Sequence, residues 1–261
     1  MQENLQIEPV GITLPPTQDE LPCDDGEPME TARHRQQMFL LLETLQPWLD
    51  QRPDGYAGGN MFLYFSLAQV RHQDFRGPDF FAVLGVPKGE RKSWVVWEEG
   101  KGPDVIIELL SESTATADKT EKKLIYQNQL KVAEYFWFDP FAPDDFAGFG
   151  LQHGVYAPIP PDSQGRLTSR CLDLVLVRWH GVYEGVETTW LRWATLAGEL
   201  LPTKDEKLQT AEQHVEMAEQ QAQTAEQQAE KAEQRALTAE QRAEAAETEI
   251  ARLRALLAEN K

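Results

Sequence analysis

Two carboxylates in the first half of the chain have the types and positions that metal chemistry needs. Glu108 is the one charge inside the apolar run VIIELL, and a carboxylate in such a run is costly to bury unless it is paired or binds a metal. Asp79 opens a second apolar run, DFFAVL. On neighbouring strands, these groups could share a hard cation such as Mg²⁺, which prefers oxygen ligands, activates water and stabilises charge on a phosphate.

A lysine on the next helix could complete such a site. Lys122 lies in a helix expected at about 118–130, and its ammonium could orient the water or stabilise the transition state. Plainer interpretations stay open: Asp79 could belong to a turn in GPD, and Glu108 could form a structural ion pair with a lysine. Most helix lysines are solvated, and Lys123 is adjacent to Lys122.

Other polar residues fit structural roles better. Asp118, three residues before Glu121, forms a capping-box pattern at the start of that helix. His34 lies on the apolar stripe of an earlier helix and is interpreted as a core or rim histidine. Ser111, Ser113 and Thr114 could line a cleft, but capping a turn is the more ordinary role for them.

Several other chemistries are excluded or disfavoured. The chain has no G-x-S-x-G and no Walker-type loop, and its histidines show no zinc spacing. Its two cysteines, Cys23 and Cys171, are too few for a disulfide scaffold. The net charge of -18 argues against gripping nucleic acid by bulk charge, although a local basic or metal-carrying cleft remains compatible with it.

Hydrophobic patterning gives the elements that must position these residues. A helix is expected at 29–50, where apolar residues recur at helical spacing. PDVIIELL is typical of a central strand covered on both faces. The order of elements indicates a mixed α/β fold, with strands at 58–66, 76–86, 93–99, 103–110 and 133–140, and hairpins up to about 200.

Composition divides the chain into three parts. Residues 1–28 are rich in proline and acid and are expected to be extended or mobile. Residues 29–203 hold all seven tryptophans and are expected to form the folded domain. The chain shows no signal peptide and no run apolar enough for a transmembrane helix, so a cytoplasmic protein with no membrane partner is expected.

Residues 204–261 predict a helical coiled coil. The segment AEQ recurs every seven residues from 211 to 239, and apolar positions alternate by three and four residues from 208 to 257. In a parallel dimer, three flanking pairs would have opposite charge: Arg235 with Glu240, Arg242 with Glu247, and Glu249 with Arg254. This pattern favours self-association as a parallel dimer; a single solvated helix or a disordered tail is the alternative.

Four strings together resemble a known family. RGPDFFAVLG, PDVIIELLSEST, DKTEKKLIY and VAEYFWFDP occur in this order and resemble the Uma-family endonucleases of the PD-(D/E)XK nuclease superfamily, over roughly 29–200. The resemblance implies a restriction-endonuclease-like mixed sheet flanked by helices, with hairpins and the coiled coil as additions. It also implies a metal-dependent endonuclease that hydrolyses DNA with Mg²⁺ or Mn²⁺.

The resemblance assigns roles to individual residues. Asp79 falls on the metal-binding aspartate of the superfamily, Glu108 on its second acid, and the carbonyl of Leu109 on a further metal ligand. Leu110 stands where the superfamily usually has lysine. In this branch the lysine is displaced to the next helix, where Lys122 matches it and Lys123 is the fallback.

Two other functions are compatible with the sequence. The chain could be a catalytically inactive interaction or scaffold protein, in which Asp79 and Glu108 are structural. Alternatively, it could be a nuclease within a larger complex, whose partner supplies the basic surface that grips DNA. Metal binding and oligomeric mass distinguish these possibilities from a self-sufficient nuclease.

Overall fold

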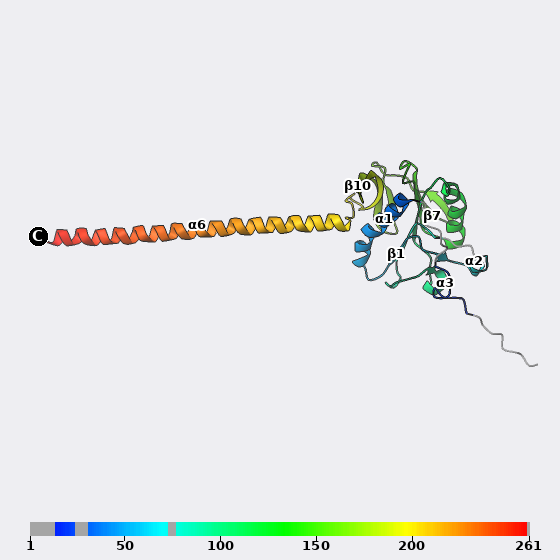
Figure 1. Cartoon of the computed structure of the whole chain (residues 1–261), viewed down its shortest axis with the longest axis horizontal. Helices are drawn as coiled ribbons and strands as arrows, with labels where there is room; N and C mark the ends of the chain where they lie inside the picture. Colours follow the sequence, from blue (N-terminus) through cyan, green and yellow to red (C-terminus); the bar gives the residue numbers. More distant parts are fainter. Residues whose placement is uncertain (1–13, 24–30, 73–76, 260–261) are drawn as a thin grey trace, which may run out of the picture. The chain divides into compact units, whose positions relative to one another are not determined.

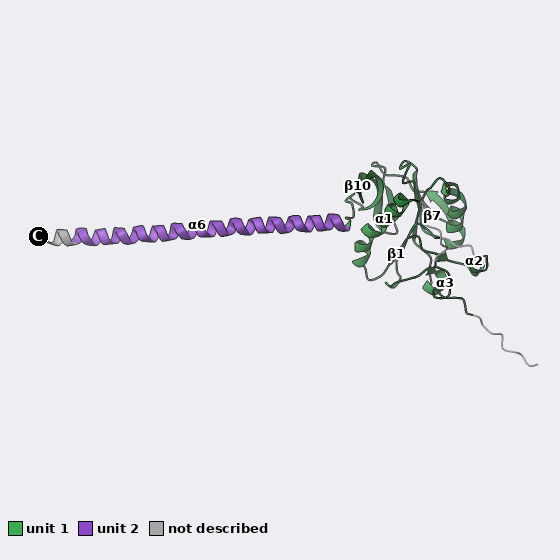
Figure 2. Ribbon diagram, in the orientation of Figure 1, with its two compact units in different colours: residues 1–203 green, residues 204–261 purple. Residues whose placement is uncertain are grey.

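The computed structural model describes residues 14–23, 31–72 and 77–259 of the 261-residue chain. It divides into two compact units, Met1–Thr203 and Lys204–Lys261, which Figure 2 shows in separate colours. The candidate site lies in the first unit, and each unit is described by itself.

The first unit alternates short strands with helices (Figure 1). Its helical segments are α1 (Ala32–Asp50), α2 (Leu67–His72), α3 (Val96–Glu99), α4 (Ala115–Ala117), the π-helical η1 (Asp118–Lys122), α5 (Lys123–Ile125) and the π-helical η2 (Tyr126–Leu130). Its strands are β1 (Tyr56–Gly58), β2 (Leu63–Tyr64), β3 (Phe80–Val83), β4 (Trp94–Val95), β5 (Val105–Leu109), β6 (Glu134–Phe138), β7 (Phe146–Gln152), β8 (Val155–Pro158), β9 (Leu167–Ser169), β10 (Leu174–Tyr183) and β11 (Val186–Thr195).

A six-stranded mixed sheet forms the centre of this unit. Its order is β1-β3-β5-β6-β7-β8, in which β5 and β6 are parallel and the other neighbours are antiparallel. Parallel neighbours need a crossover connection, and the continuous helical stretch from α4 to η2 provides it. This architecture confirms the α/β mixed sheet flanked by helices.

Both faces of β5 are covered, as its apolar run predicts. Val105, Ile107 and Leu109 pack with apolar residues of α1 on one face. Ile106 packs on the other face with Tyr126 of the crossover helix. The side chain of Glu108 must point to this second face, because successive side chains of a strand alternate.

The first helix is fixed at its start and along its inner face. The Thr31 side chain accepts the backbone N–H of His34 at the N-terminus of α1. Gln37 then bonds both the N–H and the carbonyl of Leu191 in β11, each at 2.8 Å. These bonds attach α1 to the small sheet β11-β10-β9, whose long hairpin confirms the predicted β-rich C-terminal part of the domain.

The structure differs from the expected elements at four places. The strand expected at 58–66 is broken: β1 ends at Gly58, and β2 covers only Leu63–Tyr64. The run at 93–99 was expected to be a strand, but it leaves the extended conformation after Val95 and forms α3, closed by Gly100 in the left-handed region. Helix α2 was not expected. Asp118 does not cap its helix, because the helical stretch already begins at Ala115 and the Asp118 side chain is buried within it.

Part of the N-terminal stretch has defined contacts. Trp97 Nε1 donates to the carbonyl of Pro16, Tyr64 Oη donates to that of Pro22, and Leu21 is buried. Residues 14–23, which we expected to be extended or mobile, therefore pack against α3 and β2. The rest of that stretch, 1–13 and 24–28, lies outside the described residues.

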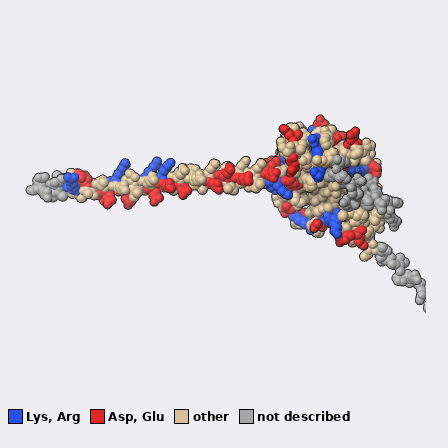
Figure 3. Space-filling view, in the orientation of Figure 1, with Lys and Arg blue, Asp and Glu red and all other residues tan. Residues whose placement is uncertain are grey.

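The second unit is one long helix, α6 (Lys204–Glu259). Its helical state agrees with the predicted pattern, and its side chains from Lys207 to Arg254 are exposed. Acidic groups line its whole length, whereas most of its basic groups lie in the C-terminal half (Figure 3). No helix of the described residues is long and apolar enough to cross a membrane.

Candidate active site

Asp79 and Glu108 face each other across two antiparallel strands. In the register of β3 and β5, Phe80 pairs with Ile107, so Asp79, one residue before β3, lies opposite Glu108. Asp79 Oδ2 accepts the backbone N–H of Leu109 at 2.7 Å. The start of β3 and the end of β5 thus bring two carboxylates together at one edge of the sheet.

Glu108 is fully buried, and both of its carboxylate oxygens have partners. Tyr126 Oη donates to Oε1 at 2.6 Å, and Lys122 Nζ donates to Oε2 at 3.2 Å. Both partners come from the crossover helix that packs over this face of β5. The buried charge is therefore paired and hydrogen-bonded, as a buried carboxylate requires.

Lys122 is held by a second acid. Its Nζ lies 2.7 Å from Asp118 Oδ1, one turn earlier on the same helix, and the Asp118 side chain is also buried. The carbonyl of Asp118 accepts Tyr135 Oη of β6 at 2.8 Å. Asp118, Lys122 and Tyr126 are spaced by four residues, which places them on one helix face.

The charges of the cluster set the protonation of its members. Burial, together with the negative charge of Glu108, raises the pKa of Asp79 well above its usual range. The same two causes raise the pKa of Asp118. Burial alone would lower the pKa of Lys122. The negative charges of the nearby Glu108 and Asp118 outweigh the effect of burial and raise this pKa, so the Lys122 side chain is a cation. Burial raises the pKa of Tyr126 well above its usual range and keeps its hydroxyl a donor.

The donor set fits a hard divalent cation. Glu108 and Asp118 both pair with Lys122, and Asp79 lies opposite Glu108, so three carboxyl groups are crowded near one lysine; burial and the charge of Glu108 raise the pKa of Asp79. A cation bound by Asp79 and Glu108 would relieve that crowding with the oxygen ligands it prefers. Among the described residues no group of three or more His, Cys, Asp or Glu side chains forms a ready metal cluster, so further ligands would have to be carbonyls or water.

The structure brings together the three side chains that the sequence singled out: Asp79, Glu108 and Lys122. Lys123 lies elsewhere, with its Nζ 3.3 Å from the centre of the Phe149 ring. Leu109 contributes its N–H to Asp79. Tyr126 and the pairing role of Asp118 were missed; their four-residue spacing around Lys122 was the available signal.

The fold and this geometry define a class: a mixed α/β protein with two acids and a lysine at one edge of its sheet. Residues 13–179 match the model of the Uma2 family, described as a putative restriction endonuclease, and the chain belongs to this family. Among solved structures it is similar to a putative nuclease belonging to DUF820 from Anabaena variabilis, with 17% identity and a TM-score of 0.41 over 60% of this chain and 91% of that one. No protein with a curated description matches it.

Proposed function

We propose that this protein is an endonuclease that hydrolyses phosphodiester bonds of DNA with Mg²⁺ or Mn²⁺. The observation that carries the proposal is the convergence of Asp79, Glu108 and Lys122, from two strands and a helix, in a chain of the Uma2 family. A carboxylate pair can hold a divalent cation, and a protonated lysine beside it can stabilise developing negative charge, so together they can support metal-assisted hydrolysis of a phosphodiester.

Each residue has a distinct part in this proposal. Asp79, Glu108 and the carbonyl of Leu109 would hold the cation, which would activate a water and stabilise charge on the phosphate. Lys122 cannot act as a base, because its ammonium stays protonated beside two acids. It would instead donate a hydrogen bond that orients the attacking water and would stabilise the negative charge that develops on the phosphate.

The first test compares two buried glutamates. Purified Glu108→Gln should lose all DNA cleavage in Mg²⁺ or Mn²⁺, because the neutral amide removes the negative charge with which this side chain would bind the cation. Glu134→Gln is the matched control: Glu134 is also buried, on neighbouring β6, but its carboxylate bonds Ser169 and two backbone N–H groups. The control should be less stable and still cut. Cleavage that survives in Glu108→Gln would contradict the proposal.

The same assay distinguishes the two adjacent lysines. Lys122→Met should lose cleavage, whereas Lys123→Met should keep it, because Lys123 lies over Phe149 and contacts neither acid. The reverse result would move the catalytic role to Lys123.

The proposal also includes a dimer that forms through the long helix α6. Residues 208–257 would pair with a second copy as a parallel dimer, because the exposed apolar positions of α6, among them Leu208, Val215, Ile250 and Leu253, would be buried there. A dimer carries two candidate sites, and cutting a duplex needs one cut on each strand.

A further inference from the structure

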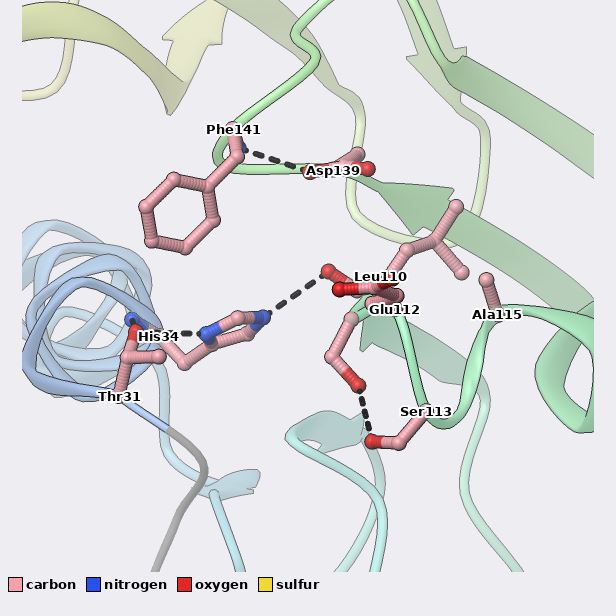
Figure 4. Close-up of a pocket in the computed structure, with 9 residues that line it drawn as sticks. Thr31, His34, Leu110, Glu112, Ser113, Ala115, Asp139 and Phe141 are labelled. Atoms are coloured by element: carbon pink, nitrogen blue, oxygen red, sulfur yellow. Dashed lines mark hydrogen bonds between the residues drawn. The ribbon is translucent and has the colours of Figure 1, made fainter.

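A pocket of about 750 Å³ lies where the chain leaves the ends of β5 and β6 (Figure 4). It is lined by the start of α1, by the segment that follows β5 and by the segment that follows β6: Thr31, His34, Leu110, Ser111, Glu112, Ser113, Ala115, Asp139 and Phe141. Its size is in the range of small-molecule binding sites. Nothing in the proposed hydrolysis uses these side chains.

The pocket lies at the same sheet edge as the two acids. Leu110 follows Glu108 by two residues, which span roughly 7 Å of strand, and its N–H donates to the carbonyl of Phe138 at the end of β6. The carboxyl ends of the parallel strands β5 and β6 thus open into this pocket. Because the pocket and the two acids lie at the same sheet edge, the pocket could hold a part of the DNA that is next to the reacting phosphate on the same strand.

One side of the pocket is aromatic. The rings of His34 and Phe141 lie 5.7 Å apart, on the opposite side from Ser113 and Ala115 in Figure 4. His34 Nε2 carries a proton, because its partner at 2.9 Å is the carbonyl of Leu110, which can only accept. Phe141 is 56% exposed, and the guanidinium of Arg33 lies 4.4 Å from its ring centre. Such rings are platforms on which a base can stack.

The charged side chains of the lining are two carboxylates, Glu112 and Asp139, whereas its hydroxyls can both donate and accept. Oδ1 of Asp139 accepts the backbone N–H groups of Phe141 and Ala142, which leaves Oδ2 free to accept from a ligand. Glu112 is exposed, and no described residue pairs with its carboxylate. Two carboxylates repel a phosphate but accept hydrogen bonds from an amino group on a base edge. The pocket therefore suits a neutral aromatic ring that carries N–H donors.

We infer that this pocket binds one unpaired base of the DNA, one that carries an exocyclic amino group, beside the phosphate at Asp79 and Glu108. The base stacks on Phe141 in place of the guanidinium of Arg33, its amino group donates to Asp139, and the displaced guanidinium turns to the adjacent phosphate. The inference rests on the proposed function for its substrate, but it is tested by binding, which is separate from cleavage.

The probe is a DNA duplex with one unpaired 2-aminopurine, a fluorescent base that carries an exocyclic amino group. Binding of the full-length protein is followed in Ca²⁺ and in EDTA by fluorescence quenching and by anisotropy of an end label. Wild-type protein should quench the probe. Unlabelled duplexes with an unpaired adenine or cytosine should compete better than duplexes with an unpaired thymine or no unpaired base.

The variants separate stacking from hydrogen bonding. Phe141→Ala should weaken binding roughly fivefold to a hundredfold, the usual range for loss of one base–aromatic stack. Phe39→Ala is the matched control, because Phe39 is also an exposed phenylalanine, at 50%, but does not line the pocket. Asp139→Asn keeps an acceptor for the two backbone N–H groups and replaces the free oxygen by a donor, so it should reduce the preference for adenine and cytosine over thymine.

Three results would overturn the inference that the pocket binds an unpaired base. Absence of quenching by wild-type protein in both conditions overturns the inference, as does equal binding by folded Phe141→Ala and Phe39→Ala. A free 2-aminopurine nucleotide that binds as tightly as the duplex would make this a mononucleotide site and overturn it too. Pocket-dependent binding without any cleavage in Mg²⁺ or Mn²⁺ would support the pocket and refute the nuclease, so the two failures are distinguishable.

Discussion

Folding stability and the proposed metal binding need opposite protonation states of Asp79. Its pKa is raised above the ordinary value of 3.8 by burial and by the charge of Glu108, so the folded protein favours the protonated form. Its contribution to stability is therefore complete below the unfolded pKa and is lost as pH rises through the folded pKa. Cation binding needs the ionised form, so metal affinity and cleavage should rise with pH over the same window.

Asp79→Asn tests this opposition. The amide can still accept the N–H of Leu109 but never ionises, so in EDTA this variant should unfold at a higher temperature than wild type, by a margin that grows from about pH 4 to about pH 8. Divalent cations should raise the unfolding temperature of wild type and leave that of the variant unchanged. Glu187→Gln, which removes an exposed carboxylate, should behave as wild type. A variant less stable than wild type at neutral pH would refute the crowded-charge account.

At the scale of the element, the helix that follows β5 acts as the support of the site. It contains two π-helical segments, η1 and η2, and such turns occur frequently at functional sites. Lys122 ends the first segment and Tyr126 begins the second, and both contact Glu108. The positions of both contacts on Glu108 thus depend on the backbone of this one helix.

Tyr126→Phe tests that support. The change leaves Glu108 Oε1 buried without its donor, and loss of an outer partner of a metal ligand usually costs ten- to a hundredfold in affinity or activity, so about that loss of cleavage is expected. Tyr156→Phe is the control, because Tyr156 is similarly buried and its hydroxyl donates to the carbonyl of Val132, away from the acids. The two variants should lose similar stability, but only Tyr126→Phe should lose activity and metal affinity.

The elements with a strong hydrophobic pattern could be predicted from the sequence, whereas the short helices α2 and α3 could not. The stripe of α1 and the apolar run of β5 each encode their structure locally. The run at 93–99 has strand composition, but its second half turns into α3, because packing of so short a segment overrides its propensity. The bond from Tyr126 to Glu108 joins residues 18 positions apart, and such contacts follow from tertiary packing, which the pattern of residue types does not specify.

At the scale of the whole molecule, the charges of α6 bear on how two copies would pair. In the predicted heptads one flanking position is glutamate in six successive repeats: Glu212, Glu219, Glu226, Glu233, Glu240 and Glu247. An antiparallel pair would place these glutamates near each other, whereas a parallel pair places them opposite Lys207, Arg235 and Arg242 among others. Repulsion therefore disfavours the antiparallel pair.

A charge swap in the full-length protein tests the parallel dimer. Arg242→Glu or Glu247→Arg alone would create like-charge pairs at two symmetric places, and because each exposed pair is worth ~0.2–1 kcal/mol, either change should weaken the dimer severalfold in sedimentation equilibrium. The double variant, Arg242→Glu with Glu247→Arg, restores opposite charges and should recover wild-type affinity. Since the alanine-rich seam buries little area per layer, small charge effects should be visible.

Two outcomes would contradict this prediction. Wild-type protein that sediments at its monomer mass of 29.7 kDa at all concentrations would refute the dimer. Additive losses of affinity in the double variant would refute the parallel register.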